Sequence, residues 1–194
     1  MDKKEVFVDV SARHIHLSRE DQDKLFGEGY ELQVHKELAG GGGFASVEQI
    51  AIVGPRSTFP KVRILGPCRK QSQVELSKTD ARALGVDAPI RLSGDLAGTP
   101  GIKLVGPAGE LDLESGVIIA KRHIHIGKKQ SEEWGLKTGD VVAVKVESEE
   151  RALIFGDTEI RVQPGEEDLA LMHIDTDEAN AAGMKPMAGY IVEF

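Results

Sequence analysis

Residues 13–18 read RHIHLS, and residues 122–127 read RHIHIG. Each stretch places an alternating His-Ile-His directly before a residue suited to begin a helix, Ser18 or Gly127. Four of the six histidines of the chain lie in these two stretches. The repetition predicts two copies of one structural unit, in which a short strand turns directly into a helix.

Four windows of the chain share this design. They read HLSREDQDKLFG from residue 16, ELSKTDARALG from residue 75, HIGKKQSEEWG from residue 125 and HIDTDEANAAG from residue 173. In each window an apolar residue precedes a helix N-cap, an Asp, Gln or Glu of a possible capping box follows three residues later, and a glycine ends the helix. The caps are Ser18, Ser77, Gly127 and Asp175, the capping-box residues are Asp21, Asp80, Gln130 and Glu178, and the inward-facing residues are Leu25, Leu84, Trp134 and Ala182. We expect four strand-to-helix corners with short helices.

The residue before the apolar position of each window is a possible metal ligand. These residues are His16, Glu75, His125 and His173. His14 and His123 stand two residues earlier in their strands, and side chains at i and i+2 of a strand point the same way. Six ligand-type groups predict two divalent metals, and a carboxylate with two oxygens is suited to bridge them.

A simpler explanation is that the histidines are shared only by descent from a duplicated segment. A single His-x-His is a weak signal, because strand histidines are often half-buried surface residues. Descent alone does not explain why the second window substitutes another metal-competent residue, Glu75. We expect His35 to be a structural or surface residue, and Cys68 to be a small packed residue rather than a ligand.

Composition excludes several classes of protein. The 194 residues carry 24 Lys and Arg against 32 Asp and Glu, so a net charge of −8 argues against broad nucleic-acid binding. The single cysteine cannot form an internal disulfide, the first residues lack the apolar stretch of a signal peptide, and no apolar run is long enough to span a membrane. We expect a cytoplasmic protein without a membrane or nucleic-acid partner.

Strand signals outnumber helix signals along the chain. Short alternating pieces at 6–10, 32–34, 62–64, 141–146, 160–162 and 190–194 are separated by Gly or Pro, which favours a barrel or sandwich over a parallel α/β sheet.

From Gln49 to Val74 there is no acidic residue, and this strip leads into Glu75. Its basic residues are Arg56, Lys61, Arg63, Arg69 and Lys70. They predict an anionic substrate near the metals or, alternatively, a solvated strand face.

Four motifs together resemble the PduL-type phosphotransacylases, the phosphate propanoyltransferase family. The motifs are VDVSARHIHLS (8–18), VRILGPCRKQSQVELS (62–77), GVIIAKRHIHIG (116–127) and LMHIDTDEANAAG (171–183). The resemblance implies a mainly β fold of two small closed barrels with short capping helices, usually in a homodimer. It also implies an interleaved chain, with residues 1–12 and 121–194 in one barrel and 13–120 in the other, including an inserted hairpin near 27–47.

The resemblance implies a function and a set of site residues. The reaction would transfer a short acyl group, propanoyl or acetyl, reversibly between coenzyme A and inorganic phosphate, with zinc as the expected metal. His14 and His16 would hold one metal, His123, His125 and His173 the other, and Glu75 would bridge. Arg69 would contact phosphate. Coenzyme A would contact Ser11, Lys36, Arg63, Leu65 and Asn180.

The chain departs from the family in one loop. Ala39 and four glycines, Gly40 to Gly43, precede Phe44, where relatives commonly carry Pro-Gly-Gln. We interpret the glycines as a flexible loop, because they lack the strand-loop-helix setting of a phosphate-binding motif. We expect no counterpart of the microcompartment-targeting helix of many relatives, because the first strand is expected from Glu5. A dinuclear metallohydrolase and a non-catalytic metal-binding module remain as alternatives.

Overall fold

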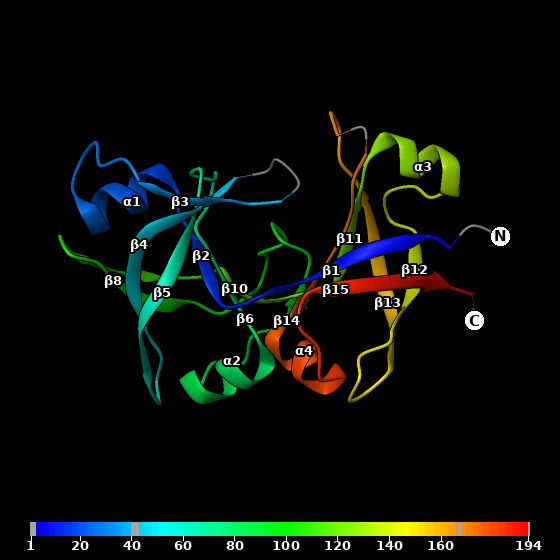
Figure 1. Ribbon diagram of the computed structural model, residues 1–194. Helices are drawn as coiled ribbons and strands as arrows, with labels where there is room; N and C mark the ends of the chain where they lie inside the picture. Colours follow the sequence, from blue (N-terminus) through cyan, green and yellow to red (C-terminus); the bar gives the residue numbers. More distant parts are fainter. Residues whose placement is uncertain (1–2, 40–42, 167, 194) are drawn as a thin grey trace. The chain divides into compact units, whose positions relative to one another are not determined.

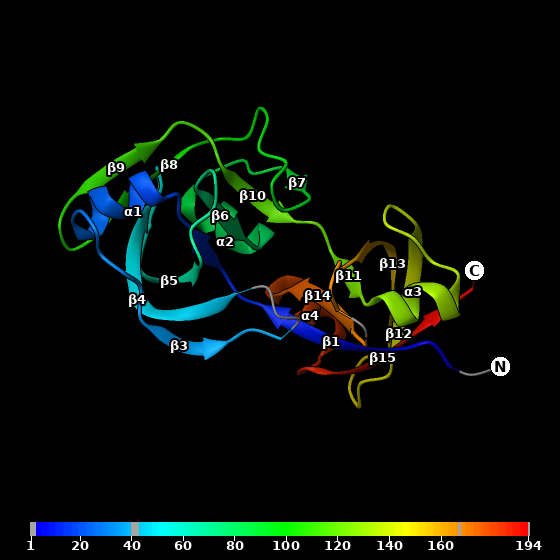
Figure 2. The same ribbon diagram turned by 90° about the horizontal axis from the view of Figure 1, so that it is seen from above.

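The chain forms two compact units in the computed structural model, which describes residues 3–39, 43–166 and 168–193. One unit combines Met1–Ser11 with Lys121–Phe194, and the other comprises Ala12–Ala120. We call them the barrel unit and the sheet unit. Both consist mainly of β-strands with short helices, as the resemblance implied (Figures 1 and 2).

Six strands of the barrel unit form a closed barrel in the order β1-β14-β11-β13-β12-β15. Their bounds are β1 Glu5–Ser11, β11 His123–Ile126, β12 Val141–Val146, β13 Leu153–Val162, β14 Ala170–Asp175 and β15 Met187–Val192. The barrel closes because β1 pairs with β14 on one side and with β15 on the other (Figure 1). In β1 the alternation of the sequence sets the faces, since Val6 and Val8 are buried while Phe7 is exposed.

Nine strands of the sheet unit form one sheet, in the order β7-β10-β6-β2-β5-β4-β8-β9 with β3 paired to β4. Their bounds are β2 His14–His16, β3 Val34–Glu37, β4 Phe44–Val53, β5 Thr58–Gly66, β6 Gln73–Leu76, β7 Ile90–Arg91, β8 Ile102–Val105, β9 Glu110–Leu113 and β10 Val117–Ala120. Unlike the expected second closed barrel, this sheet is open among the described residues. Closure would require β9 to pair with β7, which contains only two residues.

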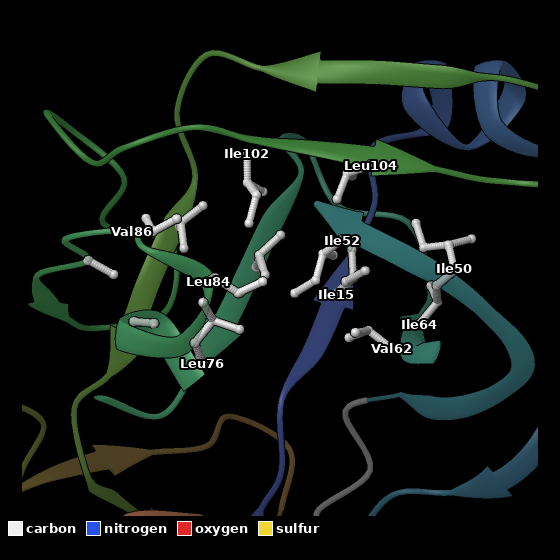
Figure 3. Packing of buried hydrophobic residues seen from close by; sticks show 14 of the residues in the cluster. Ile15, Ile50, Ile52, Val62, Ile64, Leu76, Leu84, Val86, Ile102 and Leu104 are labelled. Atoms are coloured by element: carbon white, nitrogen blue, oxygen red, sulfur yellow. The ribbon is translucent and has the colours of Figure 1, made fainter. Parts of the chain in front are cut away.

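The core of the sheet unit is built from residues of alternating strand positions. Ile15 of β2 is fully buried and packs with Ile64 of β5, Ile52 of β4 and Leu84 of the helix α2, Lys78–Leu84 (Figure 3). The barrel unit has its own core, in which Ile124 of β11 holds the equivalent place. The isoleucine between each histidine pair therefore faces the core, as the period of two predicted.

Four helices follow β2, β6, β11 and β14 at the expected corners. They are α1 Arg19–Phe26, α2 Lys78–Leu84, α3 Lys128–Trp134 and α4 Thr176–Ala182, and their N-caps are Ser18, Ser77, Gly127 and Asp175. Figure 2 shows α1 beside β9. None of the helices in the described ranges has the length and apolar character needed to cross a membrane.

The capping boxes differ from the sequence prediction in three of the four helices. Only in α4 do both bonds of the box form, with the Glu178 side chain accepting from the N–H of Asp175. In α1 and α2 the equivalent carboxylates bind other partners instead, because Asp21 accepts from the Ser72 hydroxyl and Asp80 accepts from Arg13. In α3, Gln130 donates to Asp168.

Candidate metal centres

The first candidate centre lies in the sheet unit and consists of His14, His16 and Glu75. Strand β2 runs antiparallel to β6, and His14 is paired directly with Glu75. The Nε2 atom of His14 lies 3.4 Å from Oε2 of Glu75, and the Nε2 atom of His16 lies 3.7 Å from Oε1 of the same carboxylate. All three side chains are buried, and their possible ligand atoms lie within 4.8 Å of one another. Two imidazoles and a carboxylate therefore converge on one point.

The second candidate centre lies in the barrel unit and consists of His123, His125 and His173. Here β11 runs antiparallel to β14, and His123 is paired with His173. The Nε2 atoms of His123 and His125 are 3.0 Å apart, and the ring of His173 lies 5.4 Å from that of His123 and 5.5 Å from that of His125. The ligand atoms again lie within 4.8 Å of one another.

Backbone carbonyls orient the first histidine of each pair. The Nδ1 of His14 lies 2.9 Å from the carbonyl oxygen of Ala12, and the Nδ1 of His123 lies 2.8 Å from that of Lys121. A carbonyl only accepts, so each Nδ1 carries a proton and each Nε2 is turned toward the centre. This is the outer-shell arrangement that holds metal-binding histidines in one tautomer.

Burial and charge keep two of the histidines neutral. Burial, with His14 and Arg69 nearby, lowers the pKa of His16 to about 3. Burial, with His123 and His173 nearby, lowers the pKa of His125 to about 3. Both imidazoles are therefore deprotonated at neutral pH, the form that a metal requires.

The Glu75 carboxylate and the His14 imidazole stabilise each other in their charged forms. Burial lowers the pKa of His14, but the charge and hydrogen bond of Glu75 outweigh it, so this pKa lies above the ordinary value. Burial raises the pKa of Glu75, but His14 and His16 outweigh it, so this pKa lies far below the ordinary value. Glu75 is therefore an anion throughout the neutral range, and a divalent cation would replace the proton on His14.

Two residues that the sequence analysis missed hold Glu75 in place. Gln73 donates from its side-chain amide to Oε1 of Glu75, and Ser93 donates its hydroxyl to the same oxygen at 3.0 Å. The Gln73 amide is itself oriented by Gly94, whose backbone N–H donates to Oε1 of Gln73 at 2.8 Å. Gln73 was detectable in the sequence, because it stands two residues before Glu75 as His14 stands before His16. Ser93 had no sequence signal, since it lies in a distant loop.

Arg69 reaches the same network from the segment between β5 and β6. Its guanidinium donates to the Ser93 hydroxyl at 2.8 Å, and its backbone N–H donates to the carbonyl of Leu17 at 2.8 Å. Ser93 therefore contacts both the predicted phosphate-binding arginine and the predicted metal-binding carboxylate. The Arg69 side chain is largely exposed and carries a positive charge beside the first candidate centre.

The residues predicted to contact coenzyme A are divided between the two units. In the sheet unit, Lys36 of β3 is paired with Ala45, which is paired with Leu65 of β5, and Arg63 of β5 is paired with His14. These three residues therefore lie on neighbouring strands. In the barrel unit, Ser11 ends β1 opposite Asp175, and Asn180 is exposed on α4.

Cys68 and His35 lie where the sequence analysis expected. The Cys68 thiol is half-buried beside the side chain of Gln22, and burial raises its pKa above the ordinary value. A thiol in this setting is a poor nucleophile. His35 is exposed on β3. Gly40–Gly42 of the predicted flexible loop lie outside the described residues.

Both centres fit a divalent metal of the zinc type. Each offers three nitrogen or oxygen donors from strands, and a metal held by them would keep a position for water or substrate. His16 and His125 are neutral because of their low pKa values, and backbone carbonyls orient the rings of His14 and His123. The same donors also suit cobalt or manganese, so the donor set alone does not select one metal.

Comparison with known proteins identifies the family. A family described as phosphate propanoyltransferase matches residues 7–185. A phosphate propanoyltransferase of Thermotoga maritima is 56% identical over 191 residues, which cover 97% of this chain and 90% of the relative. Relatives with the same name from Salmonella typhimurium and Listeria monocytogenes are 51% and 49% identical, covering 90% and 93% of this chain and 81% and 83% of their own lengths.

The fold and the two triads define a mainly β protein with two candidate metal centres. The chain belongs to the phosphate propanoyltransferase family. The resemblance drawn from the four motifs is thereby confirmed, and the match extends over nearly the whole sequence.

Proposed function

We propose that this protein is a metal-dependent phosphate acyltransferase, which transfers a short acyl group between coenzyme A and inorganic phosphate. Membership of the family supports the reaction. The observation that carries the metal dependence is the repeated geometry of the two triads, in which the first histidine of each pair faces a third ligand across an antiparallel ladder. The chain's relatives carry the propanoyl group in their name, and propanoyl is the acyl group we propose first.

The six triad residues are the proposed ligands. A bound divalent ion would act as a Lewis acid toward the acyl carbonyl and stabilise the negative charge that develops on its oxygen. The chain's contribution is to hold neutral His16 and His125, and anionic Glu75, in fixed positions. Zinc is the proposed metal, and a homodimer and a cytoplasmic location stay predictions.

Arg69 is the proposed phosphate-binding residue. Its planar guanidinium is suited to grip two phosphate oxygens, and its contact with Ser93 orients it next to Glu75. In the proposed reaction an oxygen of phosphate forms a bond to the acyl carbon, the carbon–sulfur bond breaks, and the electron pair leaves with the coenzyme A thiolate. Ser11, Lys36, Arg63, Leu65 and Asn180 are the proposed coenzyme A contacts.

The transfer is proposed to be direct, without an acyl-enzyme. The only thiol of the chain is Cys68, and burial raises its pKa, so it is not activated as a nucleophile. Holding phosphate and the thioester together would supply the rate through proximity rather than through a covalent intermediate.

Thiol release from propanoyl coenzyme A tests this function. We expect release to require added inorganic phosphate, to yield an acyl phosphate, and to stop after dialysis against a chelator. Release that proceeds without phosphate and yields free carboxylate would instead indicate a metallohydrolase. No release from any short acyl thioester, by protein that contains its metals, would indicate a non-catalytic module.

A further inference from the structure

An arginine precedes the histidine pair in both units, and in both it contacts a helix. Arg13 donates to Oδ1 of Asp80 on α2 at 2.8 Å. Arg122 donates to Oε1 of Glu178 on α4. Each contact joins residues of a single unit that are far apart in the sequence, so it ties a helix to the strand that carries two candidate ligands.

The two carboxylates occupy equivalent places in their units. Asp80 and Glu178 are each the third residue of a helix, and each stands five residues after the third candidate ligand, Glu75 or His173. The backbone between ligand and carboxylate turns through one corner without a loop. The arginine therefore links the strand that carries the histidine pair to the helix that follows the third ligand.

A second contact repeats in both units as well. The guanidinium of Arg13 lies 4.4 Å from the ring centre of Phe59 on β5, and that of Arg122 lies 5.9 Å from the ring centre of Phe155 on β13. These strands are the parallel partners of β2 and β11. Arg122 also donates from Nε to the carbonyl of Gly156 at 2.7 Å. A cation above an aromatic ring is stabilised there, which keeps each arginine directed at its helix.

In the sheet unit, the buried carboxylate of Asp80 depends on Arg13. Asp80 is only 8% exposed, and its Oδ2 has no hydrogen-bond partner among the described residues. A buried carboxylate with a single charged partner is costly to leave alone. In the barrel unit, Glu178 combines the contact to Arg122 with the capping box of α4.

We propose that Arg13 and Arg122 are positioning residues for the metal centres. Each sets the distance between the histidine pair of its unit and the third ligand, by fixing the helix that follows that ligand. Two observations carry this inference, the same arginine–helix contact and the same arginine–phenylalanine contact in two units with unrelated third ligands. The inference rests on the metal-binding part of the proposed function.

The test measures metal retention in the full-length chain. Arg13→Gln and Arg122→Gln are loaded with zinc and titrated with a competing chelator, well below the melting temperature of the metal-free protein. We expect each variant to hold one metal about tenfold more weakly than the unchanged chain does, as outer-shell substitutions typically do. The double variant Arg13→Gln/Asp80→Asn should lose little further affinity, because the two residues act through one contact.

Lys103→Gln is the matched control. Lys103 forms an ion pair with Glu110 at 2.9 Å on the β8–β9 hairpin of the sheet unit, away from the triad strands. Metal retention equal to the unchanged chain in both arginine variants, or an equal loss in Lys103→Gln, would overturn the inference. If a glutamine variant does not fold, Arg13→Lys and Arg122→Lys replace it. A lysine has a single nitrogen and cannot keep both the carboxylate contact of Nη1 and the guanidinium position over the phenylalanine ring, so full retention in folded lysine variants would also overturn the inference.

Failure of this inference and failure of the proposed function give different results. If the unchanged chain binds no metal, the metal dependence itself is wrong. If the unchanged chain binds metal and all arginine variants bind it equally well, only the positioning role is wrong.

Discussion

His14 lies directly opposite Glu75 in the ladder between β2 and β6, and His123 lies opposite His173 in the ladder between β11 and β14. Directly opposite residues in antiparallel strands have Cβ atoms about 5 Å apart, so their side chains meet on the same face. With a second imidazole two residues along the same strand, each unit assembles three donors on one patch of sheet.

Removal of the Glu75 charge should abolish one metal centre without changing its shape. Glu75→Gln keeps the side-chain volume but loses the anion that His14, Gln73 and Ser93 surround. We expect purified Glu75→Gln to contain less metal per chain and to lose activity by about 100-fold or more, the scale of removing a principal stabiliser of charge in the transition state. Elemental analysis and the thiol-release assay measure the two effects. The exposed Glu110→Gln is the control, and unchanged metal content in Glu75→Gln would contradict the assignment.

Replacement of Arg69 should affect phosphate use more than metal binding. A lysine in this place keeps the charge but loses the fork that contacts Ser93 and would grip phosphate. We expect Arg69→Lys to raise the KM for phosphate by about tenfold, which corresponds to about 1.4 kcal/mol of lost binding, with metal content unchanged. Lys70→Gln is the control, because Lys70 is the adjacent exposed cation. An unchanged phosphate dependence in Arg69→Lys would count against the role.

Loss of the only thiol should leave catalysis intact. Cys68 packs beside Gln22 and its pKa is raised by burial, so it is not poised to attack a thioester. We expect Cys68→Ala to retain most of its activity in the phosphate-dependent assay. A fall to background with the metals still bound would show that a covalent acyl-enzyme forms instead.

Acid should destabilise the metal-free protein in a defined range of pH. The pKa values of His16 and His125 are about 3 in the folded chain against 6.5 in model compounds, so the unfolded chain binds more protons between these values and stability falls as pH falls from 6.5. Well-buried His16 contributes up to about 1.4 kcal/mol per pH unit, while half-buried His125 contributes less because solvent screens it.

The other two groups act outside or against this trend. His14 has a raised pKa, so its contribution is present below pH 6.5 and is lost as pH rises, while Glu75, with a lowered pKa, loses its contribution only below about its ordinary value of 4.5. Two histidines have lowered pKa values and only His14 has a raised one. We therefore expect the melting temperature of chelator-treated protein to decrease as the pH is lowered from 6.5 to 4.5. His125→Asn should flatten this decrease. A midpoint that rises on acidification would contradict these pKa directions.

Much of the local structure was predictable from the sequence. The period of two directed both histidines of each pair to one face and Ile15 or Ile124 to the core, and residues suited to N-caps located all four helices. Both signals depend on neighbouring residues, where strand and helix geometry alone determine direction. The partners of the capping-box side chains were not predictable, because Asp21 and Asp80 contact residues that are distant in the sequence.

Residue types and their spacing were enough to name the ligand candidates, but the pairing of distant strands sets which of these residues meet. Pairing of β2 with β6 and of β11 with β14 is a choice of register between strands far apart in the chain, and a shift by one residue would turn Glu75 or His173 to the opposite face. The open edge of the sheet unit and the Gln73–Ser93 support of Glu75 also arise from such long-range pairing. Local periodicity carries no information about register, because register depends on how the whole core packs.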